Sequence, residues 1–117
     1  MNSGARTRYR HWQVEIADTQ AQLTLDVAGQ SANTLSRDVL AELEQALTEL
    51  APQYLRGLIL RSAKPGGFIA GADVREFEKI ADAHQATELA RNAQRVFAQL
   101  AALPFPSVAL IHGYCLG

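Results

Sequence analysis

One loop of the chain combines glycines with a polar helix start and could hold negative charge on backbone groups. Residues 63–73 include Gly66, Gly67 and Gly71 and lie between an apolar run and a short helical stretch, 74–77. Glycine lets the backbone approach a ligand closely, and N–H groups at a helix start can point at an anion. The loop lacks the G-x-x-x-x-G-K-[ST] pattern of a P-loop. It is therefore either an anion-holding backbone or an ordinary glycine-rich connection.

A second loop, residues 112–117, carries His112 and Cys115 three positions apart. A metal site needs about four ligands, and no other Cys or His pair has suitable spacing. A Cys–His pair for acyl transfer usually comes from distant positions in the chain. We therefore expect both residues to pack at a tight glycine turn, and the sequence predicts no metal site.

The elements that position these loops follow from the hydropathy pattern. Alternating apolar residues predict a hairpin, spacings of three and four predict two helices, and short continuous apolar runs predict two buried strands. The expected order is a hairpin at 12–16 and 21–27, a helix from 36 to 50, a strand at 57–61, a loop, a helix at 86–103 and a strand at 107–111. Ser36 and Asp82 are the expected helix caps. Strands separated by helices favour parallel crossovers, so the predicted fold class is α/β.

Composition excludes several classes of protein. The chain has 117 residues, 48% hydrophobic and 20% charged, which suits one small globular domain. Its net charge of -1 gives no basic footprint for nucleic acid or an anionic membrane. The apolar stretch 96–117 has Pro104 and Pro106 in its middle, so we expect no membrane span. A single cysteine favours a reducing compartment, and a cytoplasmic location is expected.

The domain boundaries follow from the same patterns. Residues 1–11 carry arginines and no apolar run, so we expect a short disordered leader there. Residues 12–117 are expected to be the N-terminal part of one domain. The chain stops after the last predicted strand, where a βαβ architecture usually builds its site, and this pattern suggests truncation.

The two loops together carry a family resemblance. Residues Phe68-Ile69-Ala70-Gly71-Ala72-Asp73, followed after the second helix by Ile111-His112-Gly113-Tyr114-Cys115-Leu116-Gly117, resemble the enoyl-CoA hydratase/isomerase (crotonase) superfamily. Residues 33–36 fit the same pattern. Residues 62–65, 90–94 and 103–106 are most similar to the amino-terminal hydratase module of multifunctional fatty-acid oxidation α subunits. The match begins near Val14 and covers less than half of a complete crotonase domain.

The resemblance implies a fold and a site. The fold would be a crotonase-like spiral of ββα units, and the substrates would be coenzyme A thioesters. The backbone N–H of Ala72 would donate to the thioester oxygen in an oxyanion hole, with a second donor in a glycine run that Gly117 begins. The residues implied to line the coenzyme A groove are Lys64, Phe68, Ile69, Ala70, Gly71, Asp73 and Gly117. Lys64 fits a solvated loop lysine equally well.

The resemblance also implies an activity, the addition of water to trans-2-enoyl-CoA in fatty-acid β-oxidation. Family hydratases use two glutamates after the glycine run, and neither position falls within this chain, so we expect the chain by itself to be inactive. Two alternatives stay open: another crotonase-fold reaction (isomerase, decarboxylase or thioester hydrolase), or a non-catalytic acyl-CoA-binding or assembly module.

Expected partners follow from the same resemblance. Coenzyme A is part of the substrate, so no cofactor is expected on this segment, and NAD would bind only a later domain. The full-length form is expected to be oligomeric, with a thiolase subunit as a candidate partner.

Overall fold

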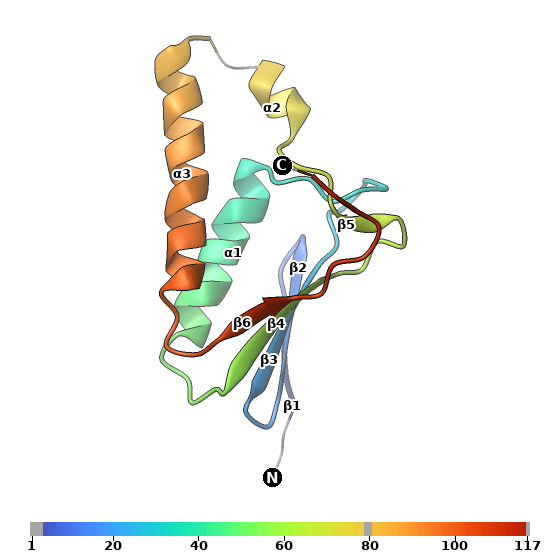
Figure 1. Ribbon diagram of the computed structural model, residues 1–117, viewed down its shortest axis with the longest axis vertical. Helices are drawn as coiled ribbons and strands as arrows, with labels where there is room; N and C mark the ends of the chain where they lie inside the picture. Colours follow the sequence, from blue (N-terminus) through green and yellow to red (C-terminus); the bar gives the residue numbers. More distant parts are fainter. Residues whose placement is uncertain (1–3, 79–80, 117) are drawn as a thin grey trace.

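A five-stranded sheet in the order β1-β2-β3-β4-β6 forms the framework of the protein (Figure 1). The structure is a computed structural model that describes residues 4–78 and 81–116. The strands are β1 (Gly4–Arg8), β2 (Trp12–Ala17), β3 (Gln20–Leu25), β4 (Gly57–Ser62) and β6 (Ser107–Ala109). The first three strands pair antiparallel, while β4 runs parallel to β3 and β6 runs parallel to β4. Helices in the connections before β4 and β6 return the chain to the same end of the sheet, which gives the parallel pairs.

Two helices pack side by side next to the sheet, and both begin at the expected caps. They are α1 (Arg37–Leu50) and α3 (Ala83–Ala101), and a short helix, α2 (Val74–Glu78), precedes α3. The Ser36 hydroxyl accepts from the Val39 N–H at 3.2 Å, and the Asp82 carboxylate accepts from the Gln85 N–H at 2.9 Å. These side chains satisfy N–H groups that lack partners within the helix. Among the described residues, no helix is long and apolar enough to cross a membrane.

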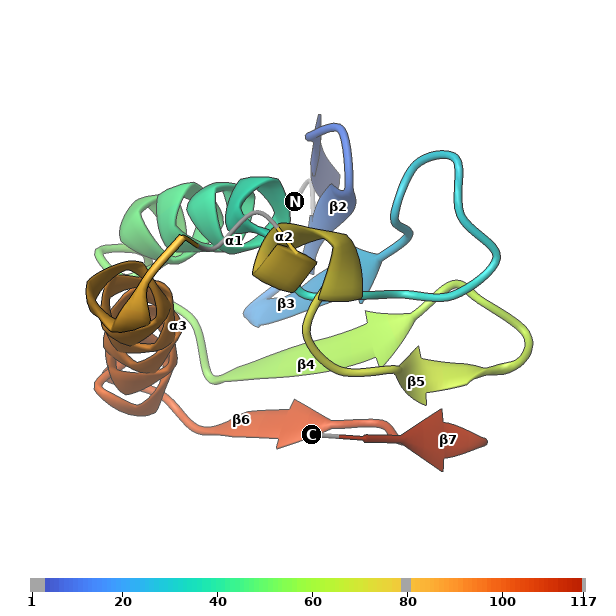
Figure 2. The ribbon, with the colours of Figure 1, turned by 90° about the horizontal axis from the view of Figure 1, so that it is seen from above.

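The core lies between one face of the sheet and α1, as the two periodicities predict. The buried strand residues alternate, and the buried helix residues recur every three or four positions. They are Trp12, Val14, Ala21, Leu23, Leu25, Leu58 and Leu60 from the strands and Val39, Leu40, Leu43, Ala46, Leu47 and Leu50 from α1. Helix α3 packs along α1 and contributes Val96, which is fully buried (Figure 2). The α/β class and the predicted hairpin are confirmed.

The expected disordered leader is wrong for residues 4–8, which form β1. This strand pairs with β2 along its whole length, from Gly4 opposite Ala17 to Arg8 opposite Gln13. An edge strand can be held by backbone hydrogen bonds to its neighbour without an apolar pattern of its own. The composition of the segment therefore gave no signal for it.

The two strands expected to be buried on both faces are buried less than that. In β4, burial alternates and Arg61 is exposed. Residues 107–111 are exposed along their length, with Val108 56%, Leu110 50% and Ile111 58% accessible. The strand β6 lies at the sheet edge, and of the strands described α1 contacts β2 most. Apolar content alone therefore overestimated the burial of these strands.

Candidate active site

The two loops that the sequence singled out meet in a second, two-stranded sheet. Its strands are β5 (Gly67–Ile69) and β7 (Tyr114–Cys115), which run parallel. Figure 2 shows them next to each other beyond the ends of β4 and β6. The Leu116 N–H extends the pairing by donating to the Ile69 carbonyl at 2.9 Å. Segments far apart in the sequence are thereby held together by backbone contacts.

Glycines make this close approach of the two loops feasible. A Cβ at Gly67 would lie 2.6 Å from the Tyr114 ring, and one at Gly113 would lie 2.2 Å from the Gly66 carbonyl oxygen. Gly113 also has a φ of +61°, which side chains disfavour. The close approach of the two loops therefore depends on a glycine from each, Gly67 from the first loop and Gly113 from the second.

Segment 69–73 lies between two other stretches of backbone. On one side, the Ala70 N–H donates to the Asn33 carbonyl at 2.8 Å. The other end of the same peptide group, the Ile69 carbonyl, accepts from Leu116 on the opposite side. The side occupied by residues 33–35 and the side occupied by β7 are therefore opposite each other.

The backbone N–H of Ala72 points towards the side of β7. The Gly71 carbonyl accepts from the Leu35 N–H at 2.8 Å, so it faces residues 33–35. The described chain contains no cis peptide bond, and in a trans peptide the carbonyl and the following N–H point in opposite directions. The Ala72 N–H consequently points away from Leu35. Ala72 is an exposed residue, and no hydrogen bond within residues 4–78 and 81–116 uses its N–H.

An apolar cavity of about 140 Å³, here called the Ala72 cavity, opens next to this segment. It is lined by Leu35, Leu40, Ala72, Asp73, Glu76, Leu89, Ala90 and Ala93. These residues come from the starts of α1 and α2 and from one face of α3. Their side chains suit an apolar group placed beside a backbone donor.

Two polar cavities continue from the Ala72 cavity through shared lining residues. The middle cavity, of about 740 Å³, shares Asp73 and Glu76 with it and reaches residues 27–30 of the β3–α1 loop. The Lys64 cavity, of about 340 Å³, shares residues 27–29 with the middle cavity and ends at Lys64. The site residues thus border three neighbouring cavities, of which the one at Ala72 is apolar and the two that reach residues 27–30 and Lys64 are polar.

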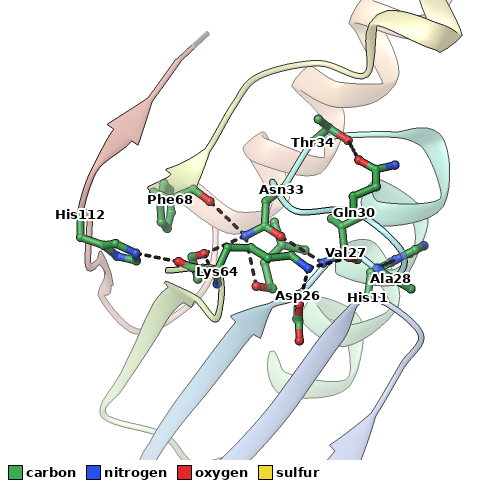
Figure 3. Close-up of polar contacts among 12 residues, drawn as sticks. His11, Asp26, Val27, Ala28, Gln30, Asn33, Thr34, Lys64, Phe68 and His112 are labelled. Carbon is green, nitrogen blue, oxygen red and sulfur yellow. Dashed lines mark hydrogen bonds and ion pairs between the residues drawn. The ribbon is translucent and has the colours of Figure 1, made fainter. Parts of the chain in front are cut away.

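Asn33 is a fully buried residue that joins three parts of the site (Figure 3). Its Oδ1 accepts from the Val27 N–H at 3.0 Å, after the end of β3. Its Nδ2 lies 2.8 Å from the Ser62 Oγ and 3.1 Å from the Phe68 carbonyl oxygen, and it also reaches the Leu25 carbonyl at 3.2 Å. Sequence reasoning gave Asn33 no role of its own. The only signal for it was its place in the family pattern.

Lys64 is held by the protein, so the expectation of a solvated loop lysine is wrong. Its Nζ lies 2.6 Å from the Asp26 carboxylate and donates to the Val27 carbonyl at 2.9 Å, and 13% of its side chain is accessible. The Lys64 carbonyl lies 2.9 Å from the His112 Nε2 (Figure 3). Lys64 therefore joins the loops after β3 and β4 and also lines a cavity.

The other residues predicted for the groove lie on the same short segment. Phe68, Ile69 and Ala70 are half-buried and Gly71 is buried. Gly117 lies outside the described residues. Of this set, Ala72 and Asp73 line the Ala72 cavity and Lys64 lines its own.

Asp73 starts α2 and does not stand alone as an acid. It is buried, and its Oδ1 accepts from the Arg75 N–H at 3.0 Å, as expected for a helix cap. Hydrogen bonding to Asp73 and its charge raise the pKa of Arg75. Glu76 accepts from the Arg37 N–H at 3.0 Å, at the start of α1. Both carboxylates near Ala72 thus have structural partners.

His112 and Cys115 show no metal-site geometry. Both residues are exposed, so the expectation that they pack at a tight glycine turn is wrong, and Cys115 lies in β7 as a free thiol. Within residues 4–78 and 81–116, no group of three or more His, Cys, Asp or Glu side chains could hold a metal ion. The exposed thiol sits on the strand that aligns the second loop with the first.

Comparison with known proteins identifies the family. The family model described as enoyl-CoA hydratase/isomerase matches residues 15–117. The chain belongs to this family. It is 46% identical over 99 residues to the fatty acid oxidation complex subunit alpha of Vibrio cholerae and 42% identical over 98 residues to that of Vibrio parahaemolyticus. Each match covers 83% of the chain.

Solved structures of the enoyl-CoA hydratase family share the fold. A putative enoyl-CoA hydratase from Streptomyces coelicolor is 30% identical, with a TM-score of 0.76 over 97% of this chain. An enoyl-CoA hydratase/carnithine racemase from Magnetospirillum magneticum is 25% identical, with a TM-score of 0.83 over 92% of this chain. The chain spans 42% and 40% of these two structures and 14% of the Vibrio subunits. The crotonase-like fold is confirmed for the part of the domain that this chain covers.

Proposed function

We propose that this chain supplies the N-terminal part of an enoyl-CoA hydratase, which adds water to trans-2-enoyl-CoA in fatty-acid oxidation. The observation that carries this proposal is the Ala72 N–H, which faces the side of β7 at a residue that also lines an apolar cavity. Family membership supplies the reaction class. The orientation of the Ala72 N–H indicates what this chain would contribute to that reaction.

The Ala72 N–H would stabilise charge on the thioester oxygen. Addition of water to the conjugated double bond places negative charge on that oxygen in the transition state, and a fixed donor stabilises it. Loss of one such donor typically costs about 2.7–4 kcal/mol of transition-state stabilisation. Ala70 is excluded from this role because its N–H is bound to Asn33.

The carboxylates of this segment are poor candidates for the acid and base of the reaction. Asp73 is paired with Arg75, and Glu76 accepts from the backbone N–H of Arg37. We therefore propose that proton transfer is supplied by glutamates of the complete domain, as the family pattern implies. This chain would contribute one oxyanion donor and part of the acyl-CoA groove.

The cavities suggest how the substrate lies. The acyl group would occupy the Ala72 cavity, where Leu35, Leu40 and Leu89 provide apolar contacts. The coenzyme A portion would follow the middle cavity past the loop after β3. Its nucleotide end would then reach the Lys64 cavity.

The experiment is a titration of the 117-residue chain with crotonyl-CoA, followed by infrared spectroscopy of the bound thioester. A hydrogen bond from Ala72 lowers the carbonyl stretching frequency. Ala72→Pro removes the N–H and should abolish this shift, whereas Ala72→Gly keeps the donor and should preserve it. A shift that persists in a folded Ala72→Pro chain, judged by circular dichroism, would assign the donor elsewhere.

A second variant tests the acyl position independently of the loop. Ala90 is exposed on α3 and lines the Ala72 cavity, so Ala90→Leu should narrow the cavity without disturbing the core. It should weaken binding of crotonyl-CoA and leave binding of free coenzyme A unchanged. Absence of any acyl-CoA binding by the unmodified chain would favour an assembly module over a hydratase fragment.

We also propose a setting for the complete protein. The relatives' name, fatty acid oxidation complex subunit alpha, describes one subunit of a larger assembly. We propose that the complete protein is oligomeric, associates with a thiolase subunit and is located in the cytoplasm. Size-exclusion chromatography of the complete protein with and without a thiolase tests this arrangement.

A further inference from the structure

Segments 33–35 and 69–73 lie side by side, and the second has one residue more between their points of contact. Asn33 binds the groups on either side of Ile69: its carbonyl accepts from the Ala70 N–H, and its Nδ2 donates to the Phe68 carbonyl. Leu35 forms a parallel bridge with Ala72. Two steps along the first segment therefore match three along the second, as in a β-bulge.

This register decides where the Ala72 N–H points. Leu35 binds the groups on either side of Ala72, because its N–H donates to the Gly71 carbonyl at 2.8 Å and its carbonyl accepts from the Asp73 N–H at 3.4 Å. In a paired strand, the N–H and carbonyl of the residue between those groups point to the opposite side. If Leu35 paired with Gly71 instead, the Ala72 N–H would donate to the Leu35 carbonyl. A slip of one residue would thus turn the proposed oxyanion donor away from β7.

Main-chain bonds by themselves do not distinguish the two registers. Every residue except proline offers the same N–H and carbonyl, so a shifted segment finds equivalent partners. Gly66, Gly67 and Gly71 make this part of the chain rich in glycine, and the register of such segments is weakly specified. In the observed register Gly71 also has a φ of +108°. A side-chain contact is therefore needed to select it.

The Asn33 side chain supplies that contact and ties it to the five-stranded sheet. Its Nδ2 lies 3.1 Å from the Phe68 carbonyl oxygen, where a regular parallel pair would use a main-chain N–H (Figure 3). The amide is itself fixed at the sheet. Its Oδ1 accepts from Val27, just after β3, and its Nδ2 lies 2.8 Å from the Oγ of Ser62, the last residue of β4. Asn33 is fully buried, so water does not compete for these bonds.

We infer that Asn33 is a positioning residue: its side-chain bond to Phe68 sets the register of segment 69–73 and thereby the direction of the Ala72 N–H. The link to catalysis rests on the proposed function, which makes this N–H an oxyanion donor. The register itself is a property of the chain without substrate. It can therefore be measured independently of acyl-CoA binding.

The test is amide hydrogen exchange of the 117-residue chain, followed residue by residue by NMR. In the unmodified chain the Ala70 N–H should be protected and the Ala72 N–H should exchange rapidly. In Asn33→Ala the segment should slip, so exchange at Ala72 should slow by about fivefold, equivalent to one backbone hydrogen bond of about 1 kcal/mol. A loss of stability alone accelerates exchange, so a slower rate at Ala72 reports the register.

Ser62→Ala is the matched control. It removes a buried hydroxyl that accepts from the Asn33 Nδ2 and from the Lys64 N–H, so it should also lower stability. It keeps the bond between Asn33 and Phe68, and the Ala72 N–H should therefore still exchange rapidly. Slower exchange at Ala72 in this variant as well would contradict the role assigned to the Phe68 bond.

A measurement on the unmodified chain covers the case in which Asn33→Ala does not fold. Trimethylamine N-oxide favours the folded state and is added to all samples. In the unmodified chain, the side-chain amide hydrogens of Asn33 should exchange as slowly as the Ala70 N–H, because the same opening exposes both. Rapid exchange of this side-chain amide beside a protected Ala70 N–H would overturn the inference.

Infrared spectroscopy of bound crotonyl-CoA separates this inference from the proposed function. The shift of the thioester carbonyl should be lost in Asn33→Ala and retained in Ser62→Ala. If Ala72 exchange slows in Asn33→Ala but the unmodified chain does not bind crotonyl-CoA, Asn33 sets the register and the proposed function is wrong. If a folded Asn33→Ala chain keeps rapid exchange at Ala72 and the full carbonyl shift, the positioning role is wrong and the proposed function stands.

Discussion

Replacement of Asn33 by alanine should destabilise the chain more than any other single polar truncation in the β3–α1 loop. The change leaves the Val27 N–H without its Oδ1 acceptor and removes the Nδ2 bonds to Ser62 and Phe68. An unsatisfied buried N–H costs about 1–3 kcal/mol, and each lost hydrogen bond contributes about 0.5–1.5 kcal/mol. We therefore expect a loss of about 2–6 kcal/mol of unfolding free energy, a large part of a small domain's total of about 5–15 kcal/mol.

Urea denaturation followed by circular dichroism measures this loss. The control is Thr34→Ala, which removes a hydroxyl 3.3 Å from Gln30 in the same loop and should change stability by less than about 0.5 kcal/mol. Asn33→Asp should be at least as harmful as Asn33→Ala, because a buried carboxylate would face the Leu25 and Phe68 carbonyl oxygens. A loss below about 1 kcal/mol for Asn33→Ala would mean that water replaces the amide, and the structural role assigned to it would be refuted.

Three further predictions concern activity, packing and pH. The 117-residue chain should show no turnover of crotonyl-CoA above a buffer blank, because one donor without an acid and a base is insufficient; measurable hydration would overturn the division of roles proposed above. Gly67→Ala should lower the melting temperature because its Cβ would meet the Tyr114 ring, whereas Gly57→Ala, whose Cβ would lie 3.7 Å from the Pro106 carbonyl, should change it little. Partial burial, with a hydrogen bond to Glu49, raises the pKa of Tyr9 from 10.0 to about 12. The folded chain therefore keeps the Tyr9 hydroxyl proton at pH values where the unfolded chain has lost it. The free energy of unfolding should consequently fall as pH rises from 10.0 to about 12. Tyr9→Phe should reduce this fall in a plot of unfolding free energy against pH.

Local patterns were sufficient to predict the elements that bury a single face. The alternation in β2 and β3, the stripe on α1 and the caps Ser36 and Asp82 all involve residues close in sequence. The pairing of β1 depends on backbone groups that every residue carries, so its composition gave no signal. The exposure of β6 depends on what covers it, which an apolar run does not reveal.

The sequence was sufficient to predict which backbone segments form the candidate site, but not which partners its side chains contact. Glycine spacing and the family pattern located the segment around Ala72 and the loop that meets it. The roles of Asn33 and Lys64 depend on partners 29 to 38 positions away in the sequence, namely Ser62 and Phe68 for Asn33 and Asp26 for Lys64. Such contacts become visible only when the strands and loops are placed in space.

The donor at Ala72 is fixed by main-chain atoms on both sides, and this has an evolutionary consequence. The bonds of Leu35 to Gly71, Ala70 to Asn33 and Leu116 to Ile69 use no side chain of segment 69–73. Mutations at Ala70 or Ala72 can therefore reshape the pocket wall while the N–H proposed as the oxyanion donor keeps its direction. Such a site can drift from one acyl group to another by single substitutions, with its means of stabilising charge inherited unchanged.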